Sequence, residues 1–221
     1  MLFRSEDRVS AEAACYRGYA VQRSRGPLVA SRFLNSLPDF RGAEPEHIAT
    51  LLSLKGQVAA MFRDFERAEA KGLTYTTPPL DRDLEVVGYP VVTVYLVSDQ
   101  LDADIHVTLS EVDPSGAARY VTEGQLRASN RATGTPPWNN LGLPWHPSRR
   151  ADARALVPGQ PARLSVVLQP TATLFNRGHR LRIAITGADA DNTEPPPGRP
   201  TIAVLRDAAH PSGVMLPVRR P

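Results

Sequence analysis

The amino-acid sequence predicts an all-β fold, in which many short strands form a β-sandwich or jelly roll. From residue 73 onward, runs of β-branched and aromatic residues recur about every ten residues, separated by turns that contain Pro or Gly. Several of these runs alternate apolar and polar residues, as strands do when one face lies on a core. The strand–helix alternation of an α/β sheet is missing from this part of the sequence.

The expected strands cover residues 73–77, 84–89, 91–97, 104–112, 119–123, 162–168, the run that follows Gly178, 201–205 and 214–218. Proline separates some of them, because a proline cannot donate a hydrogen bond within a sheet. Pro78 and Pro79 end the first strand, and Pro90 lies between the second and the third. The sequence Asp-Pro-Ser-Gly at 113–116 predicts a type I turn, and Pro-Gly at 158–159 predicts another turn.

Two strands have the clearest alternation. In the run 175–189, a turn at Gly178 precedes Leu181, Ile183 and Ile185, which alternate with Arg180, Arg182 and Ala184. In the run 104–112, we expect the core face to hold Ile105, Val107 and Leu109, with Val112 as a further candidate. Both patterns are typical of half-buried antiparallel strands with one polar face.

One amphipathic helix is expected near the N-terminus. Apolar residues recur at helical spacing and would form one stripe, on which Lys55 also lies. They are Ile48, Leu51, Leu52, Val58, Met61, Phe62 and Phe65. Pro45 suits a helix start, and Gly72 lies just beyond the helix end. We expect residues 1–72 to form this helix and some N-terminal strands, for which 18–22 and 31–35 are the candidates. We expect this part to pack on a β-sandwich of residues 73–221, so that both belong to one structural domain.

Composition excludes several classes of protein. The chain of 221 residues has 42% hydrophobic residues and no apolar run near the length of about 18 that a membrane span needs. The N-terminus is charged and lacks the apolar core of a signal peptide, so we expect a cytoplasmic protein. The single cysteine, Cys15, cannot form an internal disulfide. The net charge of +3 comes from scattered arginines, so we expect neither nucleic acid nor membrane as a partner.

The sequence offers no nucleophile motif, and we expect no catalytic residue in this chain. No Gly-x-Ser-x-Gly elbow of an α/β-hydrolase occurs. Asp207, His210 and Ser212 have the residue types of a triad, but triads are assembled from separate elements, so a turn is the favoured interpretation. We expect no cofactor. Asp189 and Asp191 are a weak calcium candidate, as is the pair Asp102 and Asp104, for which turn chemistry is favoured.

The long loop from about 129 to 153 holds the candidate binding residues. They are Trp138 with Asn139, and Trp145 with His146, and they include both tryptophans of the chain. Indole rings on a loop can stack on a sugar, line an apolar pocket or form an interface. They can equally anchor the loop to the sheet.

Several stretches resemble one family. They are LTYTTPPL at 73–80, DAD at 102–104, YVTEGQLRAS at 120–129, LVPGQP at 156–161, GHRLR at 178–182 and the D-x-x-H-P-S pattern at 207–212. Together they resemble the C-terminal β-domain of the CocE/NonD hydrolases, the X-prolyl dipeptidyl-peptidase and cocaine-esterase type of serine hydrolase. The resemblance implies a galactose-binding-like jelly roll that packs on an α/β-hydrolase domain and helps to wall its active site.

In this family the catalytic Ser, Asp and His belong to the other domain, so no residue of this sequence inherits their roles. We expect the chain to be a fragment that lacks its α/β-hydrolase domain and is inactive alone, with that domain as its partner. The alternatives are a stand-alone carbohydrate- or ligand-binding module that uses Trp138 and Trp145, and a homo-oligomer formed through a subunit interaction surface.

Overall fold

A computed structural model describes residues 2–5, 72–187 and 198–219 of the chain. In these residues the regular structure is almost entirely β. The strands are β1 (Leu2–Ser5), β2 (Leu73–Thr76), β3 (Leu84–Gly88), β4 (Val91–Ser98), β5 (Asp104–Val112), β6 (Ala118–Arg127), β7 (Ala162–Val167), β8 (Thr171–Phe175), β9 (Arg180–Thr186), β10 (Ile202–Leu205) and β11 (Gly213–Leu216). The expected helix after Pro45 and the strand candidates at 18–22 and 31–35 lie outside the described residues.

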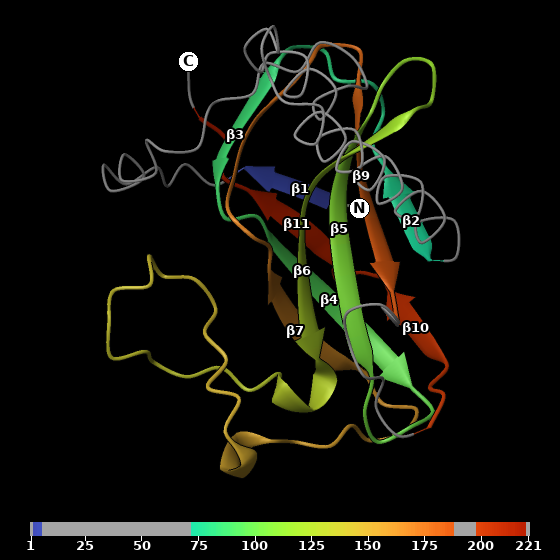
Figure 1. Ribbon diagram of the computed structural model, residues 1–221. Coiled ribbons are helices and arrows are strands. Elements are labelled where there is room, and N and C mark those ends of the chain that lie inside the picture. The colour runs from blue at the N-terminus through green and yellow to red at the C-terminus, as the bar shows by residue number, and fades with distance from the viewer. Residues whose placement is uncertain (1, 6–71, 188–197, 220–221) are drawn as a thin grey trace, which may run out of the picture.

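Two main sheets form the layers of a sandwich, one behind the other in Figure 1. One sheet has the order β2-β9-β5-β6, and all of its pairs are antiparallel. The other is centred on β4, with β7 on one edge and β10 and β11 on the other. The prediction of an all-β sandwich is therefore confirmed. A single core cluster includes Leu96 and Leu164 from one sheet and Ile105 and Ile183 from the other.

The periodicity predicted for β5 and β9 agrees with the burial. Ile105, Val107 and Leu109 are fully buried, as are Leu181 and Ile183 to within 1% exposure. Strict alternation would turn Val112 away from the core, because it lies an odd number of residues after Leu109. The pairing of β5 with β6 shifts register between Leu109 and Ser110, but the extra residue of this β-bulge is Val121 of β6, and β5 pairs with β9 without a shift. Val112 is 3% exposed although alternation places it on the face opposite to Leu109.

Strand β4 has an interrupted neighbour on one edge. Its first residues, Val91 to Thr93, pair with β11, and its last residues, Tyr95 to Ser98, pair with β10. The chain between these two strands, residues 206–212, leaves the sheet and returns. This excursion contains all three residues of the triad-like group, Asp207, His210 and Ser212, so the group lies on a single connecting segment between β10 and β11.

Strand β8 was not expected from the sequence. It pairs with β3 in a separate two-stranded sheet, and its sequence Thr-Ala-Thr-Leu-Phe lacks a clear alternation. On the other edge of β3, the chain near the C-terminus adds a bridge between Val86 and Val218. Strand β6 is also longer than expected, because it continues to Arg127. Strand β1 pairs in parallel with β11.

The turns follow the residues that predict them. Gly116 N donates to Asp113 O at 3.0 Å, which closes the expected turn at 113–116. Gln160 N donates to Val157 O at 3.0 Å, and Gly159 has a φ of 77°. This geometry is a type II turn, which places Pro at its second position and Gly at its third. In the described residues no helix is long and apolar enough to cross a membrane.

A buried carboxylate joins the β5–β6 hairpin to the turn before β9, at one end of the β2-β9-β5-β6 sheet. Glu111 of β5 is 3% exposed, and its Oε2 accepts hydrogen bonds from Arg119 of β6. Its Oε1 accepts the backbone N–H of Asn176 at 3.1 Å and lies 2.9 Å from Nδ1 of His179. Glu111 thereby fixes the turn before β9 against the β5–β6 hairpin.

Candidate functional site

The predicted binding residues lie on one long loop at the lower end of the sandwich in Figure 1. The loop leaves after the short 3-10 turn η2 (Ala128–Asn130) and returns at η3 (Arg150–Asp152). The structure brings the two tryptophans together. The rings of Trp138 and Trp145 lie 5.5 Å apart between centroids and are inclined by 75°, an edge-to-face contact. The side chain of Trp138 is nevertheless 58% exposed.

The tip of the loop is a tight turn with an unusual residue in it. Leu143 N donates to Asn140 O at 3.1 Å, and both central residues have positive φ, 62° at Leu141 and 73° at Gly142. This is the geometry of a type I′ turn, whose first central position favours Asn, Asp or Gly. Leucine is strained there, yet its side chain is 45% exposed.

Amide side chains brace this turn. Oδ1 of Asn139 accepts a hydrogen bond from Leu141 N at 3.0 Å, and Nδ2 of Asn140 donates to Leu143 O at 2.6 Å. At the neck of the loop, Gly134 N donates to Trp145 O at 3.0 Å. The tip is held by its own polar groups, so Trp138 and Leu141 are presented in a defined arrangement.

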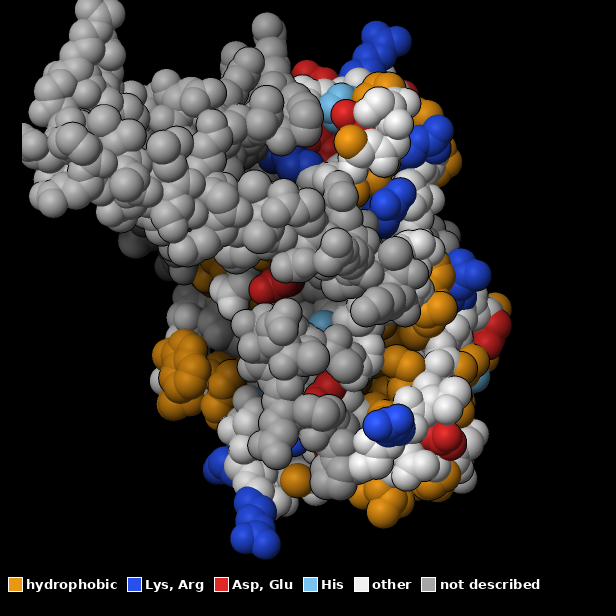
Figure 2. Space-filling view, turned by 45° about the vertical axis from the view of Figure 1, so that its right-hand side comes forward, with side chains coloured by type: hydrophobic (Ala, Val, Ile, Leu, Met, Phe, Trp, Pro, Cys, Tyr) orange, Lys and Arg blue, Asp and Glu red, His pale blue; other side chains and the backbone are white. Residues whose placement is uncertain are grey.

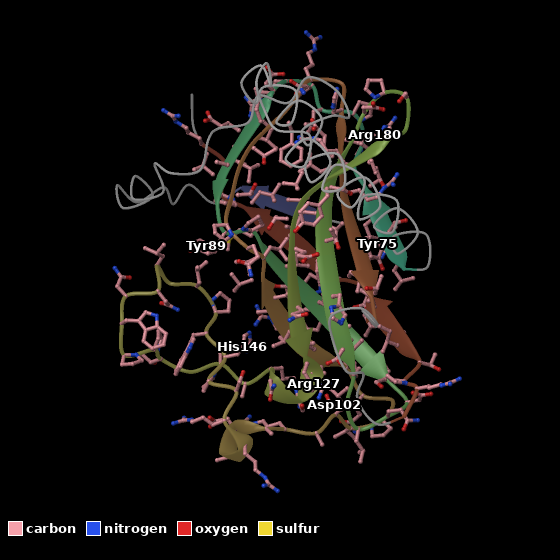
Figure 3. The ribbon with its side chains drawn as sticks, viewed as in Figure 1. Tyr75, Tyr89, Asp102, Arg127, His146 and Arg180 are labelled. Atoms are coloured by element: carbon pink, nitrogen blue, oxygen red, sulfur yellow. The ribbon has the colours of Figure 1, made fainter. Side chains whose placement is uncertain are left out.

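His146 connects the loop to the sandwich. Its Nδ1 lies 3.2 Å from Ala132 O on the outgoing side of the loop, and its Nε2 lies 2.9 Å from Ser165 O in β7. Figure 3 shows His146 at the point where the loop returns to the sandwich. A neutral imidazole can donate one of these two hydrogen bonds and an imidazolium can donate both. His146 acts here as an anchor of the loop.

The base of the loop is fixed by an arginine and an aspartate. Nη1 of Arg131 donates to Ala128 O at 3.0 Å and also contacts Arg154 O, while Nη2 donates to Ala155 O at 3.2 Å. Oδ1 of Asp102 accepts hydrogen bonds from Ala103 N at 2.9 Å and from Ser129 N at 2.8 Å.

The aspartates considered for calcium have other partners or lie elsewhere. Asp104 forms a two-pronged ion pair with Arg127, with both distances 2.9 Å, and Figure 3 shows Arg127 beside Asp102 at the same end of the sandwich. Among the described residues, no group of three or more His, Cys, Asp or Glu side chains could hold a metal ion. Asp189 and Asp191 lie outside the described residues.

The triad-like group forms the excursion between β10 and β11. Oδ1 of Asp207 accepts the backbone N–H groups of Ala209 and His210, both at 2.9 Å, and lies 3.0 Å from Nδ1 of His210. The hydrogen bond with the His210 side chain lowers the pKa of Asp207. Oγ of Ser212 accepts a hydrogen bond from Tyr95 N at 2.8 Å. The serine oxygen thus binds a β4 donor where the neighbouring strand is interrupted.

A small depression lies next to this excursion. It is lined by Tyr75, Val204, Arg206 and Ser212, among others, and its volume is about 20 Å³. The guanidinium of Arg206 lies 4.8 Å from the ring centroid of Tyr75, a cation–π contact. A space of this size holds about one water molecule, so it cannot accommodate a substrate.

The comparison with family models decides the family. Residues 9–214 match the model described as the X-Pro dipeptidyl-peptidase C-terminal non-catalytic domain. The chain belongs to this family. The expected resemblance to the CocE/NonD hydrolases is therefore confirmed, and the chain is a C-terminal domain of the non-catalytic type.

Relatives and solved structures agree with the family. Two mycobacterial proteins named as serine esterases, one from Mycobacterium bovis and one from Mycobacterium tuberculosis, are each 46% identical over 163 residues, which is 72% of this chain. The match covers 26% of each, so this X-Pro dipeptidyl-peptidase C-terminal domain spans about a quarter of those relatives. A CocE/NonD family hydrolase from Staphylococcus aureus shares the fold, with a TM-score of 0.58 and 17% identity over 69% of this chain and 31% of that one.

An aminopeptidase from a marine-sediment Thaumarchaeota archaeon also shares the fold. Its TM-score is 0.52 and its identity 21%, over 67% of this chain and 26% of that one. At identities of 17% and 21%, these two structures show the fold alone.

Sequence reasoning identified the loop but missed three of its features. The strain at Leu141 and the fork of Arg131 depend on the path of the backbone. The dipeptide Leu-Gly was the available signal for the turn, but it is far weaker than the usual Asn-Gly. The anchoring role of His146 depends on β7, and no local pattern connects the two.

Proposed function

We propose that this chain is the domain of a serine hydrolase that packs against the catalytic α/β-hydrolase domain and forms part of the wall of its active site. The match of residues 9–214 to a C-terminal non-catalytic domain carries the proposal. The serine-esterase names of the mycobacterial relatives favour an ester as the substrate class. Catalysis would then take place in the partner domain, and this chain would form part of the active-site wall and exclude water from the site.

The chemistry of the described residues supports this division of roles. Ser212 is engaged with the backbone of Tyr95, and the depression beside it is too small for a substrate. Where Figure 2 shows described side chains, Lys and Arg are interspersed with Asp and Glu. The cytoplasmic location and a homo-oligomeric state stay predictions of the sequence.

The experiment pairs this chain with the region of the Mycobacterium tuberculosis relative that lies outside their match. The two are co-expressed, and hydrolysis of p-nitrophenyl acetate is measured for the pair and for each part alone. We expect the pair to turn over the ester and this chain alone to be inactive. If the chain neither associates with that region nor changes its turnover, the proposal is wrong.

A further inference from the structure

We propose that the tip of the long loop, defined as Trp138 and Leu141, is the anchor with which this chain docks on its catalytic domain. The inference rests on the proposed function and adds to it the surface that makes the contact. Three observations carry it: the composition of the loop, its internal bracing and the strained conformation of one exposed residue.

The loop has the composition of an interface core. Between Arg131 and Arg149 the sequence contains no Lys, Arg, Asp or Glu, although charged residues make up 22% of the chain. The same segment contains both tryptophans. Depletion of charge and enrichment of aromatic residues distinguish the buried centre of protein interfaces from other surface. Tryptophan is among the residues that most often dominate binding energy.

Hydrogen bonds within the chain hold the loop in one conformation. His146 connects it to β7, Arg131 fixes its base, and Asn139 and Asn140 brace the tip. A surface that is already in its binding geometry avoids much of the entropy cost of association.

The exposed leucine opposes the local preference of the chain. The φ of 62° at Leu141 suits Asn or Gly, and a leucine that is still 45% exposed gives only part of the packing energy that could offset the strain. Strain of this kind is typical of positions whose side chain serves a function. Contact with another apolar surface would supply the missing stabilisation.

The catalytic domain is the occupant that these observations favour. The mycobacterial relatives contain about three quarters of their length outside the match, so a large protein surface is attached to this domain in them. A tethered surface is present at high effective concentration. A sugar is a poorer fit, because amide groups beside the indole, Asn139 Oδ1 and Asn140 Nδ2, already bind backbone atoms of the turn.

The test uses the full chain, co-expressed with the non-matching region of the Mycobacterium tuberculosis serine esterase, and measures the dissociation constant of the complex. Trp138→Ala removes the main anchor and should weaken binding at least tenfold, as for a typical hot spot. Leu141→Asn creates the Asn-Gly sequence that the turn prefers, so it should preserve or raise the thermal midpoint of the chain while weakening binding. Val157→Ala is the matched control, since Val157 is 55% exposed on a turn outside the loop.

Each outcome decides a different point. Binding by the original chain and by Val157→Ala, with weaker binding by both loop variants, supports the docking role. Equal binding by all four chains overturns the docking role and leaves the proposed function standing. Absence of binding by the original chain overturns both. Retardation of the chain in gels that contain soluble polysaccharide, lost in Trp138→Ala, would assign the loop to a carbohydrate and overturn the docking role.

The folded state of the loop can be followed separately. Both tryptophans lie in it, so the intrinsic indole emission of the chain alone reports the environment of this loop. The Leu141→Asn variant should keep the emission of the original chain. A changed emission together with lower binding would show that the tip had been lost, and it would contradict the turn geometry on which the docking role depends.

Discussion

Replacing Glu111 with alanine tests how the β5–β6 hairpin is held to the turn before β9. The carboxylate is 3% exposed and binds Arg119, whose side chain is only 15% exposed. Removing one partner of a buried ion pair leaves the other charge without compensation, which costs about 3–5 kcal/mol. The backbone N–H of Asn176 also loses its acceptor. A domain of this kind has a free energy of unfolding of about 5–15 kcal/mol, so the loss is a large part of it.

The measurement is urea unfolding at pH 7, followed by circular dichroism and analysed by linear extrapolation. The Glu111→Gln variant keeps one acceptor oxygen and nearly the same side-chain volume. Its free energy of unfolding should therefore fall by less, about 1.5–3 kcal/mol. The matched control is Arg219→Ala. Arg219 pairs with Glu85 at 3.3 Å, but its side chain is 64% exposed, and pairs of this kind contribute below about 1 kcal/mol.

A double variant separates the ion pair from other effects. If Glu111 and Arg119 stabilise each other, the loss in Glu111→Ala/Arg119→Ala should be smaller than the sum of the two single losses by at least about 1 kcal/mol. A loss below about 1 kcal/mol for Glu111→Ala, or strictly additive losses in the double variant, would refute the reasoning. The carboxylate of Glu111 would then contribute no more to the free energy of unfolding than an exposed carboxylate does.

Three further predictions concern single positions. Gly124→Ala should lower the free energy of unfolding by about 1–3 kcal/mol in urea, because its Cβ would lie 2.5 Å from Val167 O; no loss would contradict this close approach. Gly178→Ala should lower the free energy of unfolding in urea by about 1–2 kcal/mol. The cause is its φ of 81° alone, since no atom lies within 4 Å of the added carbon, so Gly178→Asn should lower it less. Burial raises the pKa of Tyr120 to about 12, so an absorbance titration at 295 nm should show one tyrosine ionising late, which Tyr120→Phe removes. Because the folded state keeps this proton longer than the unfolded state, stability should fall as the pH rises from about 10 toward 12, and less so in Tyr120→Phe.

The features that depend on local residues could be predicted from the sequence. The core face of β9 follows from the alternation of Leu181, Ile183 and Ile185, and its turn follows from Gly178. Proline and glycine at 158–159 likewise indicated a turn. Such features can be predicted from a short stretch of sequence, because the direction of side chains in a strand and the φ angles in a turn depend on residues within a few positions.

The features that depend on distant residues could not be predicted. Glu111 and Asn176 are 65 positions apart, and nothing near either of them indicates that they meet. Strand β8 lacks a clear alternation, and its partner β3 comes from a distant part of the sequence. The role of Ser212 depends on the gap that β10 and β11 leave beside Tyr95. In each case the partner comes from another part of the chain.

The central claim is that this chain contributes structure to a hydrolase and that the nucleophile belongs to its partner. Labelling with a fluorophosphonate, which reacts covalently with activated serines, tests it most directly. The probe is applied to the full chain co-expressed with the non-matching region of the Mycobacterium tuberculosis serine esterase, and labelled peptides are identified by mass spectrometry. The account predicts a label on a serine of that region and none on this chain. A label on this chain, at Ser212 above all, would contradict it.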